Sequence, residues 1–249
     1  MWTRESIKTR AKAVLKINYW KAFVVSLVIA IVGGAGGGGG GNAGGNGARD
    51  GNYGTTVSEE FIGIAIMFIL IFLAILFFVL LIRIFLGYSL EVGGRKFFIR
   101  AAEGETNIGY LGYCFKESRY LKVLLTMLLR AAYVFLWTLL LIIPGIIKSY
   151  AYRMVPYILA DNPSIGYNRA IELSNHMTRG EKWNIFVLDL SFIGWYLLGM
   201  AALGIGVLFV NPYADATNAE LYLILRQSAI DRGLTSYGEL NIEEGFTNN

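Results

Sequence analysis

The stretch Phe61–Ile82 limits the possible folds of this chain more than any other. It holds 22 consecutive residues without a charged side chain, most of them Ile, Leu, Phe and Val. A helix of this length can cross the roughly 30 Å hydrocarbon core of a bilayer with some tilt. A helix that is apolar on every side belongs inside a large protein or in a membrane. In a chain of 249 residues, the stretch predicts a membrane-spanning helix.

The composition of the whole chain supports an integral membrane protein. Hydrophobic residues make up 55% of the sequence and charged residues 16%, whereas soluble domains carry about 25% charge. The net charge is +4, but the cations cluster beside apolar runs, which is typical of contact with anionic lipid and of topology control. We therefore expect membrane lipids as partners, other membrane proteins as a further class, and no nucleic acid.

Residues 1–21 predict an amphipathic N-terminal helix, because they carry six Lys or Arg residues and one acid. Such a helix favours the membrane surface, with its apolar side in lipid. The alternative is a solvated helix that leads into the first span. The apolar or aromatic residues that recur at helical spacing are Trp2, Ile7, Ala11, Leu15 and Tyr19.

The apolar run that follows, residues 22–32, is short for a span. Extended back to Ile17 it reaches 16 residues, about 24 Å of helix. A cleaved signal peptide is the alternative, since small residues follow the run. Residues 33–60 begin with a segment rich in glycine, 13 of the 22 residues from 33 to 54. This composition predicts a flexible extracytoplasmic loop rather than a phosphate-binding motif, because no Lys-Ser or Lys-Thr follows.

The remaining apolar runs complete an all-α, polytopic membrane protein with about six transmembrane helices and the N-terminal amphipathic helix. We expect one membrane domain, residues 1–233, and a polar, frayed tail, residues 234–249. Asp161-Asn162-Pro163 and Asn211-Pro212 are expected to begin helices. The predicted spans are 17–32, 61–82, 123–143, 146–160, 183–210 and 213–233.

The distribution of Lys and Arg predicts the orientation. Three segments are rich in these residues: the N-terminal leader, residues 83–122 and residues 161–182. The glycine-rich segment carries Arg49 alone. Because cytoplasmic loops carry the excess of Lys and Arg, both termini are expected in the cytoplasm. Five spans would remain if the first were cleaved.

Several longer motifs resemble one bacterial family. They are "LLLIIPGIIKSYAYRMVPYILADNP", "LDLSFIGWYLLG" and "NPYADATNAELY", supported by "IKTRAKAVLKINYWKAF" and "GYSLEVGGRKFFIRAAEGE". Together they closely resemble the membrane family catalogued as domain of unknown function 975. The resemblance implies a six-helix protein of the bacterial plasma membrane, and it supplies no reaction. The layout is also distantly similar to the membrane domain attached to some glycerophosphodiester phosphodiesterases, without their catalytic domain.

Ionisable residues inside the apolar runs indicate a polar seam. Each costs about 2.5–3.5 kcal/mol on insertion scales and normally faces protein or water. Arg153 is expected to pair with Asp215 or Glu220, while Lys148, about 140° around the helix, snorkels outward. The seam either binds an anionic headgroup, a peptide or a small solute, or only fixes helix packing. Its predicted residues are Tyr150, Arg153, Tyr157, Asp215, Asn218, Glu220 and Tyr222.

The sequence offers little for an enzyme. With one cysteine, Cys114, and one histidine, His176, neither an intrachain disulfide nor a His/Cys zinc site is expected. The acid pairs Glu59-Glu60 and Glu103/Glu105 are expected to be solvated. We therefore expect no catalytic residue, metal or cofactor.

Two functions stay open on the sequence alone. The first is a non-enzymatic envelope or membrane-organising protein that binds lipid or membrane-protein partners. The second is a transporter or exporter of a small polar or amphiphilic substrate, and a lipid-headgroup enzyme is a weaker third. The motif Ser-Phe-Ile-Gly-Trp predicts packing instead of binding: Gly194 would allow close helix contact, Trp195 would fill the gap, and Ala202 and Gly206 would continue the small-residue face.

Overall fold

The computed structural model describes residues 2–33, 59–115, 117–201 and 204–242 of the chain. These residues form helices joined by turns and contain no strand, so the predicted all-helical class is confirmed for them. The prediction of a glycine-rich extracytoplasmic loop falls mostly outside the described residues. In chain order the helices are α1 (Arg4–Gly33), α2 (Glu59–Ile82), the π-helix η1 (Arg83–Gly87), α3 (Tyr88–Ala102), the 3-10 helix η2 (Ile108–Phe115), α4 (Glu117–Leu140), α5 (Ile142–Ala151), α6 (Val155–Asp161), α7 (Tyr167–Met177), α8 (Lys182–Ala201), α9 (Ile205–Asp231) and α10 (Tyr237–Leu240).

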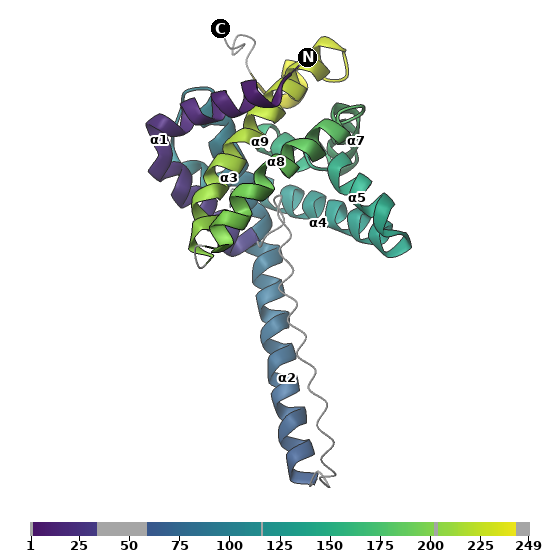
Figure 1. Cartoon of the computed structure of the whole chain (residues 1–249). Coiled ribbons are helices and arrows are strands. Elements are labelled where there is room, and N and C mark those ends of the chain that lie inside the picture. The colour runs from purple at the N-terminus through teal and green to yellow at the C-terminus, as the bar shows by residue number, and fades with distance from the viewer. Residues whose placement is uncertain (1, 34–58, 116, 202–203, 243–249) are drawn as a thin grey trace.

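The helix α2 extends away from the body formed by the other helices (Figure 1). It continues through η1 into α3, so the predicted span is one part of a much longer helix. The side chains of residues 66–80 are all exposed. Among the described residues, four helices are long and apolar enough to cross a membrane: Arg4–Ile31, Ile66–Ala102, Arg119–Leu140 and Lys182–Ala201. The count of six spans stays a prediction.

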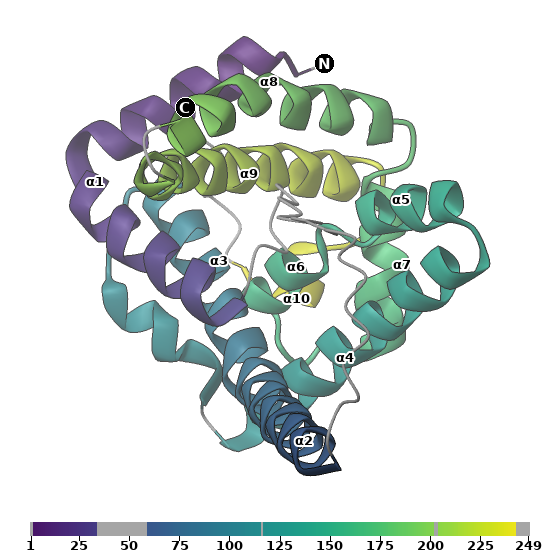
Figure 2. The ribbon, with the colours of Figure 1, turned by 60° about the horizontal axis from the view of Figure 1, so that its bottom comes forward.

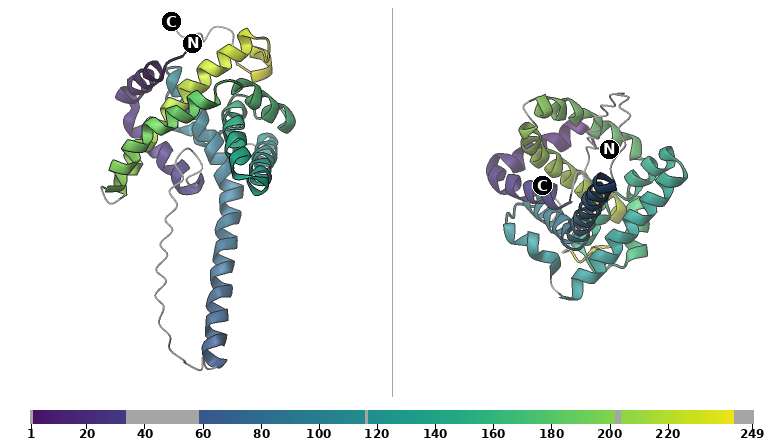
Figure 3. Two further views of the ribbon diagram at one scale, coloured as in Figure 1. Left: turned by 45° about the vertical axis from the view of Figure 1, so that its right-hand side comes forward. Right: turned by 90° about the horizontal axis from the view of Figure 1, so that it is seen from below.

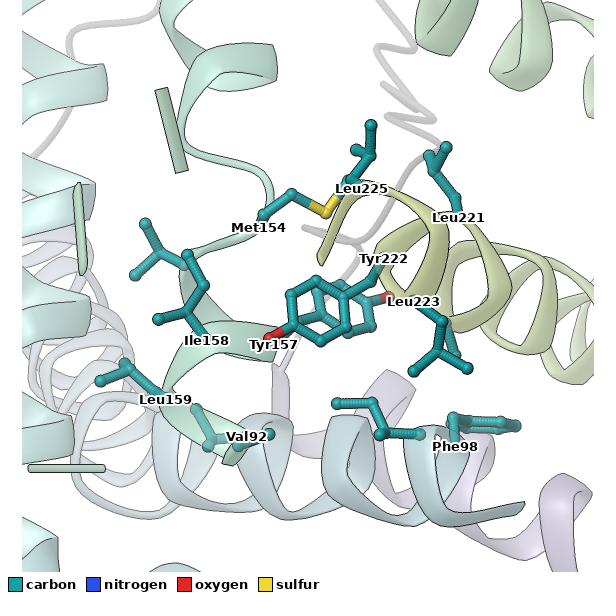
Figure 4. Close-up of a cluster of buried hydrophobic side chains, with 14 of the residues drawn as sticks. Val92, Phe98, Met154, Tyr157, Ile158, Leu159, Leu221, Tyr222, Leu223 and Leu225 are labelled. Carbon is teal, nitrogen blue, oxygen red and sulfur yellow. The ribbon is translucent and has the colours of Figure 1, made fainter. Parts of the chain in front are cut away.

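The body is built around α3 and α6, which the other helices enclose (Figure 2). The core includes large side chains from α3, α6 and α9, such as Phe98, Ile158 and Tyr222, each at most 1% exposed (Figure 4). Burying one such apolar side chain contributes about 1.5–3 kcal/mol. The body therefore holds α3, α6 and α9 in fixed positions relative to one another.

The N-terminal helix α1 differs from its prediction. Its apolar face is present, with Ile7 and Ala11 fully buried, but it packs against α9 and not into lipid. Lys8 Nζ on the same helix donates a hydrogen bond to Ser191 Oγ on α8, 2.6 Å away. Asn18 has non-helical backbone angles, so α1 is kinked between the leader and the apolar run. The kink lets both halves of α1 follow the body.

The break between α4 and α5 comes before the Pro-Gly pair, not at it. Leu141 is the extended residue, with φ −157° and ψ 136°, and Pro144 and Gly145 lie inside α5. Proline is tolerated near the start of a helix because the first N–H groups have no partner there. A Cβ on Gly145 would lie 2.4 Å from Thr138 Oγ1. Glycine is therefore needed where α5 folds back against α4.

The prediction of one span over 146–160 is wrong, because α5 ends at Ala151 and α6 begins at Val155. Pro156 stands in the first turn of α6, where it fits as a helix start. The prediction that Asp161 begins a helix is also wrong, since Asp161 ends α6 and α7 begins at Tyr167. The side chain of Asp161 is buried and takes part in tertiary contacts instead.

The predicted span 183–210 is two helices. α8 ends at Ala201, and α9 begins at Ile205 after Gly204, whose φ of +78° suits glycine. The pair Asn211-Pro212 lies inside α9 and does not begin it. The sequence signal was ambiguous because Gly204 is flanked by apolar residues and no polar turn pattern surrounds it.

The close contact between α8 and α9 is at Gly199 and Gly206, not at Gly194. A Cβ on Gly199 would lie 2.7 Å from the backbone nitrogen of Val207. A Cβ on Gly194 would meet no atom within 4 Å, and Trp195 is 55% exposed. The packing role predicted for Gly194 and Trp195 is therefore wrong, and Gly206 acts from the next helix.

The C-terminal segment is docked on the body as far as residue 242, so the prediction of a frayed tail is wrong there. Glu239 accepts hydrogen bonds from Arg169 Nε at 2.6 Å and Nη2 at 3.0 Å. Leu240 is fully buried. Two charge-assisted contacts and one apolar anchor hold this short segment. Residues 243–249 fall outside the described part of the chain.

Low pH is expected to release α10. Hydrogen bonds from Arg169 lower the pKa of the Glu239 carboxyl. The stability that this ion pair contributes is therefore fully present above the unfolded-state pKa of about 4.3. It is lost as the pH falls through the lower pKa of the folded state. Both side chains are about one-third exposed, so the effect is below about 1 kcal/mol. Amide hydrogen exchange of residues 237–242, corrected for intrinsic rates, should rise as the pH falls below the folded-state pKa of Glu239. Glu239→Gln should show the raised exchange already at pH 6, and full protection in that variant would contradict the assignment.

Candidate functional site

A cavity of about 270 Å³ lies where α3 to α6 meet α8 and α9. Four of the seven predicted seam residues line it, Tyr150, Arg153, Tyr157 and Asn218. None of the other seven residues that line the cavity was predicted as a site residue. The lining residues are Glu91, Arg95, Arg130, Ile146, Ser149, Tyr150, Arg153, Pro156, Tyr157, Asp189 and Asn218.

Arg153 is bound by Asp189 and Asn218. Its Nη2 donates to Asp189 Oδ1 and to Asn218 Oδ1, both at 2.8 Å, and its Nη1 pairs with Asp189 Oδ2. The Tyr150 hydroxyl donates to the same carboxylate at 3.0 Å. The prediction that Asp215 or Glu220 pairs with Arg153 is wrong. Arg153 lies in the break between α5 and α6, from which its side chain reaches α8.

Asp215 pairs with Arg95 of α3 instead. Arg95 Nη1 lies 2.6 Å from Asp215 Oδ1, and the Ser26 hydroxyl donates to Oδ2 at 2.7 Å. The Arg95 guanidinium also lies over the Tyr157 ring, 5.2 Å from its centroid, a favourable cation–π geometry. The sequence analysis placed Arg95 in a cytoplasmic loop. Its helical spacing from Glu91, four residues earlier, was the signal that could have placed it on a helix.

Tyr222 belongs to a second, fully buried cluster around Asp161. Asp161 is 1% exposed, and its Oδ2 accepts from the Tyr222 hydroxyl at 2.8 Å and from Arg226 Nη1 at 3.0 Å. Lys96 Nζ lies 3.6 Å from Oδ1. The Tyr222 ring stacks on Tyr157, with centroids 5.3 Å apart (Figure 4). Tyr157 therefore stands between the cavity and this cluster.

Glu103 is paired and not solvated, contrary to its prediction. Its side chain is 7% exposed and accepts from Arg226 Nη2 at 2.8 Å. Arg100 adds a longer ion pair at 3.3 Å. These contacts extend the Asp161 cluster to the end of α3.

Glu220 lies apart from both clusters. It is 3% exposed, and its Oε2 has no hydrogen-bond partner among the described residues. The positive charge of Arg10 on α1 attracts the Glu220 carboxylate electrostatically, and no hydrogen bond joins the two side chains in the described part of the chain. The predicted seam is therefore divided among a cavity, a buried ion cluster and the contact of α1 with α9.

Arg130 distinguishes the cavity from the ion clusters. It lies near the middle of α4, and its Nε donates to the Tyr152 carbonyl at 2.9 Å. Within the described residues no carboxylate lies within 4 Å of its guanidinium. Of the two carboxylates that line the cavity, Asp189 is bound by Arg153 through both oxygens, and Glu91 lies 3.9 Å from Arg95. The cavity thus presents a cation with free donors, which suits an anion.

Lys148 takes no part in the cavity. Its Nζ lies 5.0 Å from the Trp137 ring centroid and 5.7 Å from that of Tyr152. It shares no hydrogen bond with Arg153 in the described part of the chain. Among the same residues, no group of three or more His, Cys, Asp or Glu side chains is placed to hold a metal ion. The donors that the cavity offers to a ligand include its arginines and tyrosines.

Comparison with known families places part of the chain. Residues 138–229 match the family described as protein of unknown function (DUF975). The resemblance expected from the sequence motifs is confirmed over this DUF975 segment. The segment runs from the end of α4 to near the end of α9, so it includes Arg153, Asp189 and Asn218. Arg95 and Arg130 lie before it. No curated protein and no solved structure matches the chain.

Proposed function

We propose that this chain is a non-enzymatic, multi-pass protein of the bacterial cell membrane that binds lipid or membrane-protein partners and thereby organises the envelope. The observation that carries the proposal is the unbroken apolar surface of α2. Its side chains from residue 66 to 80 are exposed on every side of the helix, and exposed apolar surface of this extent is typical of contact with lipid or with an apolar partner.

Two further apolar surfaces support contact with lipid. The end of the α4–α5 hairpin exposes Leu139 to Ile143 at 62–73% of their surface. The facing ends of α8 and α9 expose Leu198 and Ile205 at 66% and 60%. Both ends lie on the side of the body from which α2 extends (Figures 1 and 3). One bilayer on that side would cover all three surfaces, with both termini on the cytoplasmic side.

A transporter of a small polar or amphiphilic substrate is the second candidate. The cavity favours it, since four seam residues and three arginines line a space large enough for a small solute. Transport would require the cavity to open alternately to the two sides of the membrane.

Extraction of the full chain together with its native lipid tests the proposal. The chain should stay in the membrane fraction after alkaline carbonate and should release bound lipid or protein in native mass spectrometry. Liposomes containing it should show no flux of small phosphates or amino acids. Release without detergent would contradict the proposal, and solute flux above that of empty liposomes would replace it with transport.

A further inference from the structure

We propose that the cavity binds a phosphate group, with Arg130 as its principal ligand and the Tyr157 hydroxyl as a second donor. The inference rests on the proposed function, because it names the chemistry by which a membrane-bound chain would select a lipid. Free phosphate esters carry the same group, so the site is defined by phosphate and not by the remainder of the ligand.

Arg130 differs from the other arginines of the region in its hydrogen-bond partners. Arg153 and Arg226 direct both terminal nitrogens at carboxylate or amide oxygens between 2.5 and 3.0 Å away. Arg95 reaches Asp215 at 2.6 Å. Arg130 has its Nε bound to a carbonyl, and both terminal nitrogens are without a hydrogen-bond partner in the described residues. A structural arginine at this depth would be expected to be fully paired.

None of the carboxylates around the cavity accepts a hydrogen bond from Arg130 in the described residues. Asp189 is bound by Arg153 and Tyr150, and Asp215 is bound by Arg95 and Ser26. Glu91 lies 3.9 Å from Arg95. An anion that enters the cavity would supply the acceptor that the terminal nitrogens of Arg130 lack among the described residues. A guanidinium with two free nitrogens on one edge matches two phosphate oxygens.

The remaining donors and the size of the cavity also suit a phosphate group. Tyr157 lines the cavity, and its hydroxyl has no hydrogen-bond partner among the described residues. The buried Nε of Arg95, which lines the same cavity, is also without a partner. The volume of about 270 Å³ is several times the ~30 Å³ of one water. It therefore accommodates a phosphate and a few attached atoms, but not a large solute.

The surroundings explain why the phosphate of a lipid fits. Ile146 lines the cavity and is 50% exposed. It stands on α5 one turn from Ile142 and Ile143, which are more than 70% exposed. A lipid could place its phosphate at Arg130 while its acyl chains lie along the apolar end of the α4–α5 hairpin.

The test uses the full chain in a neutral detergent and three probes. Dioleoyl phosphatidic acid carries the phosphate with acyl chains, dioleoylglycerol carries the chains alone, and glycerol 3-phosphate carries the phosphate alone. Native mass spectrometry gives a dissociation constant for each. Phosphatidic acid should bind at least tenfold more tightly than dioleoylglycerol. Binding of glycerol 3-phosphate would show that free phosphate esters also enter, and its absence would show that acyl chains are required; both support the phosphate site.

The variants locate the binding. Arg130→Gln should weaken phosphatidic acid binding about 10- to 100-fold, because it removes a charged hydrogen-bond donor. Tyr157→Phe should weaken it about 3- to 10-fold, and it keeps the ring that packs on Tyr222, so it serves if Arg130→Gln does not fold. Lys122→Gln is the control, since it removes one charge from an exposed position of the same helix. Its affinity should equal that of the unaltered chain.

Two results would overturn the inference. One is equal binding of phosphatidic acid and dioleoylglycerol, and the other is unchanged affinity in both Arg130→Gln and Tyr157→Phe. If phosphatidic acid fails to bind while other lipids remain on the natively extracted chain, the phosphate site is excluded and the proposed lipid-binding function stands. If no lipid or partner remains on the native chain, the proposed function itself fails.

Discussion

Asp161→Leu is expected to destabilise the protein by about 3–5 kcal/mol, more than any other substitution considered. The substitution removes the carboxylate that accepts from Tyr222 and Arg226 and lies near Lys96. It leaves Lys96 and Arg226 without this carboxylate in a buried site, since Asp161 is 1% exposed. Breaking a buried ion pair by removing one partner typically costs this amount, because the remaining charge is uncompensated. Thermal unfolding in detergent should show the loss as a large fall in Tm.

The reactivity of Cys114 gives a direct reading of this unfolding. The thiol is buried, and burial raises its pKa to about 12, so a thiol-reactive dye should label it only after unfolding. Asp231→Leu is the control, because Asp231 is exposed at the end of α9 and accepts one hydrogen bond from Gln227. Its Tm should change little. Equal Tm values for Asp161→Leu and the unaltered chain would show that the cluster does not hold α3, α6 and α9 together.

Arg153→Asp is expected to have the second largest effect, and Asp189→Arg in the same chain should restore part of the stability. The single substitution places two carboxylates together where Arg153 and Asp189 now pair at 2.8 Å, and Asp189 is about one-quarter exposed. We expect a loss of about 3 kcal/mol for the single variant and a coupling energy of at least 1 kcal/mol in the double-mutant cycle. Tm measured under one detergent condition provides all four corners of the cycle.

The control for this cycle is Asp215→Arg, which the sequence alone would have chosen as the rescuing change. Asp215 pairs with Arg95 at 2.6 Å, so its reversal should add to the damage. Rescue by Asp215→Arg in place of Asp189→Arg would contradict the observed pairing.

The helix that dominates the sequence was predicted well because its signal is local. From Phe61 to Ile82 every residue is apolar or small, so no tertiary information is needed to recognise it. Helix ends inside apolar runs were not predictable in the same way. Leu141 and Gly204 are flanked by apolar residues, and the polar patterns at Asp161 and Pro212 indicated helix starts that are not there. In an apolar environment, the packing of neighbouring helices decides these positions and local turn chemistry does not.

Four residues of the candidate site were predicted from the sequence, but their partners were not. The cost of burying Arg153 singled it out, and Asp215, Asn218 and Tyr222 recur at intervals of three and four residues, which is helical spacing. Asp189, the partner of Arg153, lies 36 residues away on another helix. The spacing of residues along one helix does not show which other helices it contacts. Arg95 lies in the segment 83–122, which was predicted as a cytoplasmic loop, and Arg130 lies inside the predicted span 123–143, where no partner was assigned to it. Because each charge was judged alone, their convergence on one cavity could not be inferred.

We infer that hydrocarbon surrounds α2. Single nitroxide labels at four consecutive positions, Leu70 to Leu73, in a Cys114→Ala background reconstituted in liposomes test it most directly, because four residues cover a full helical turn. Collisions with molecular oxygen should be frequent at all four labels, and collisions with a water-soluble nickel complex should be rare. Frequent collisions with the nickel complex at any of these labels would show that water, and not hydrocarbon, reaches α2.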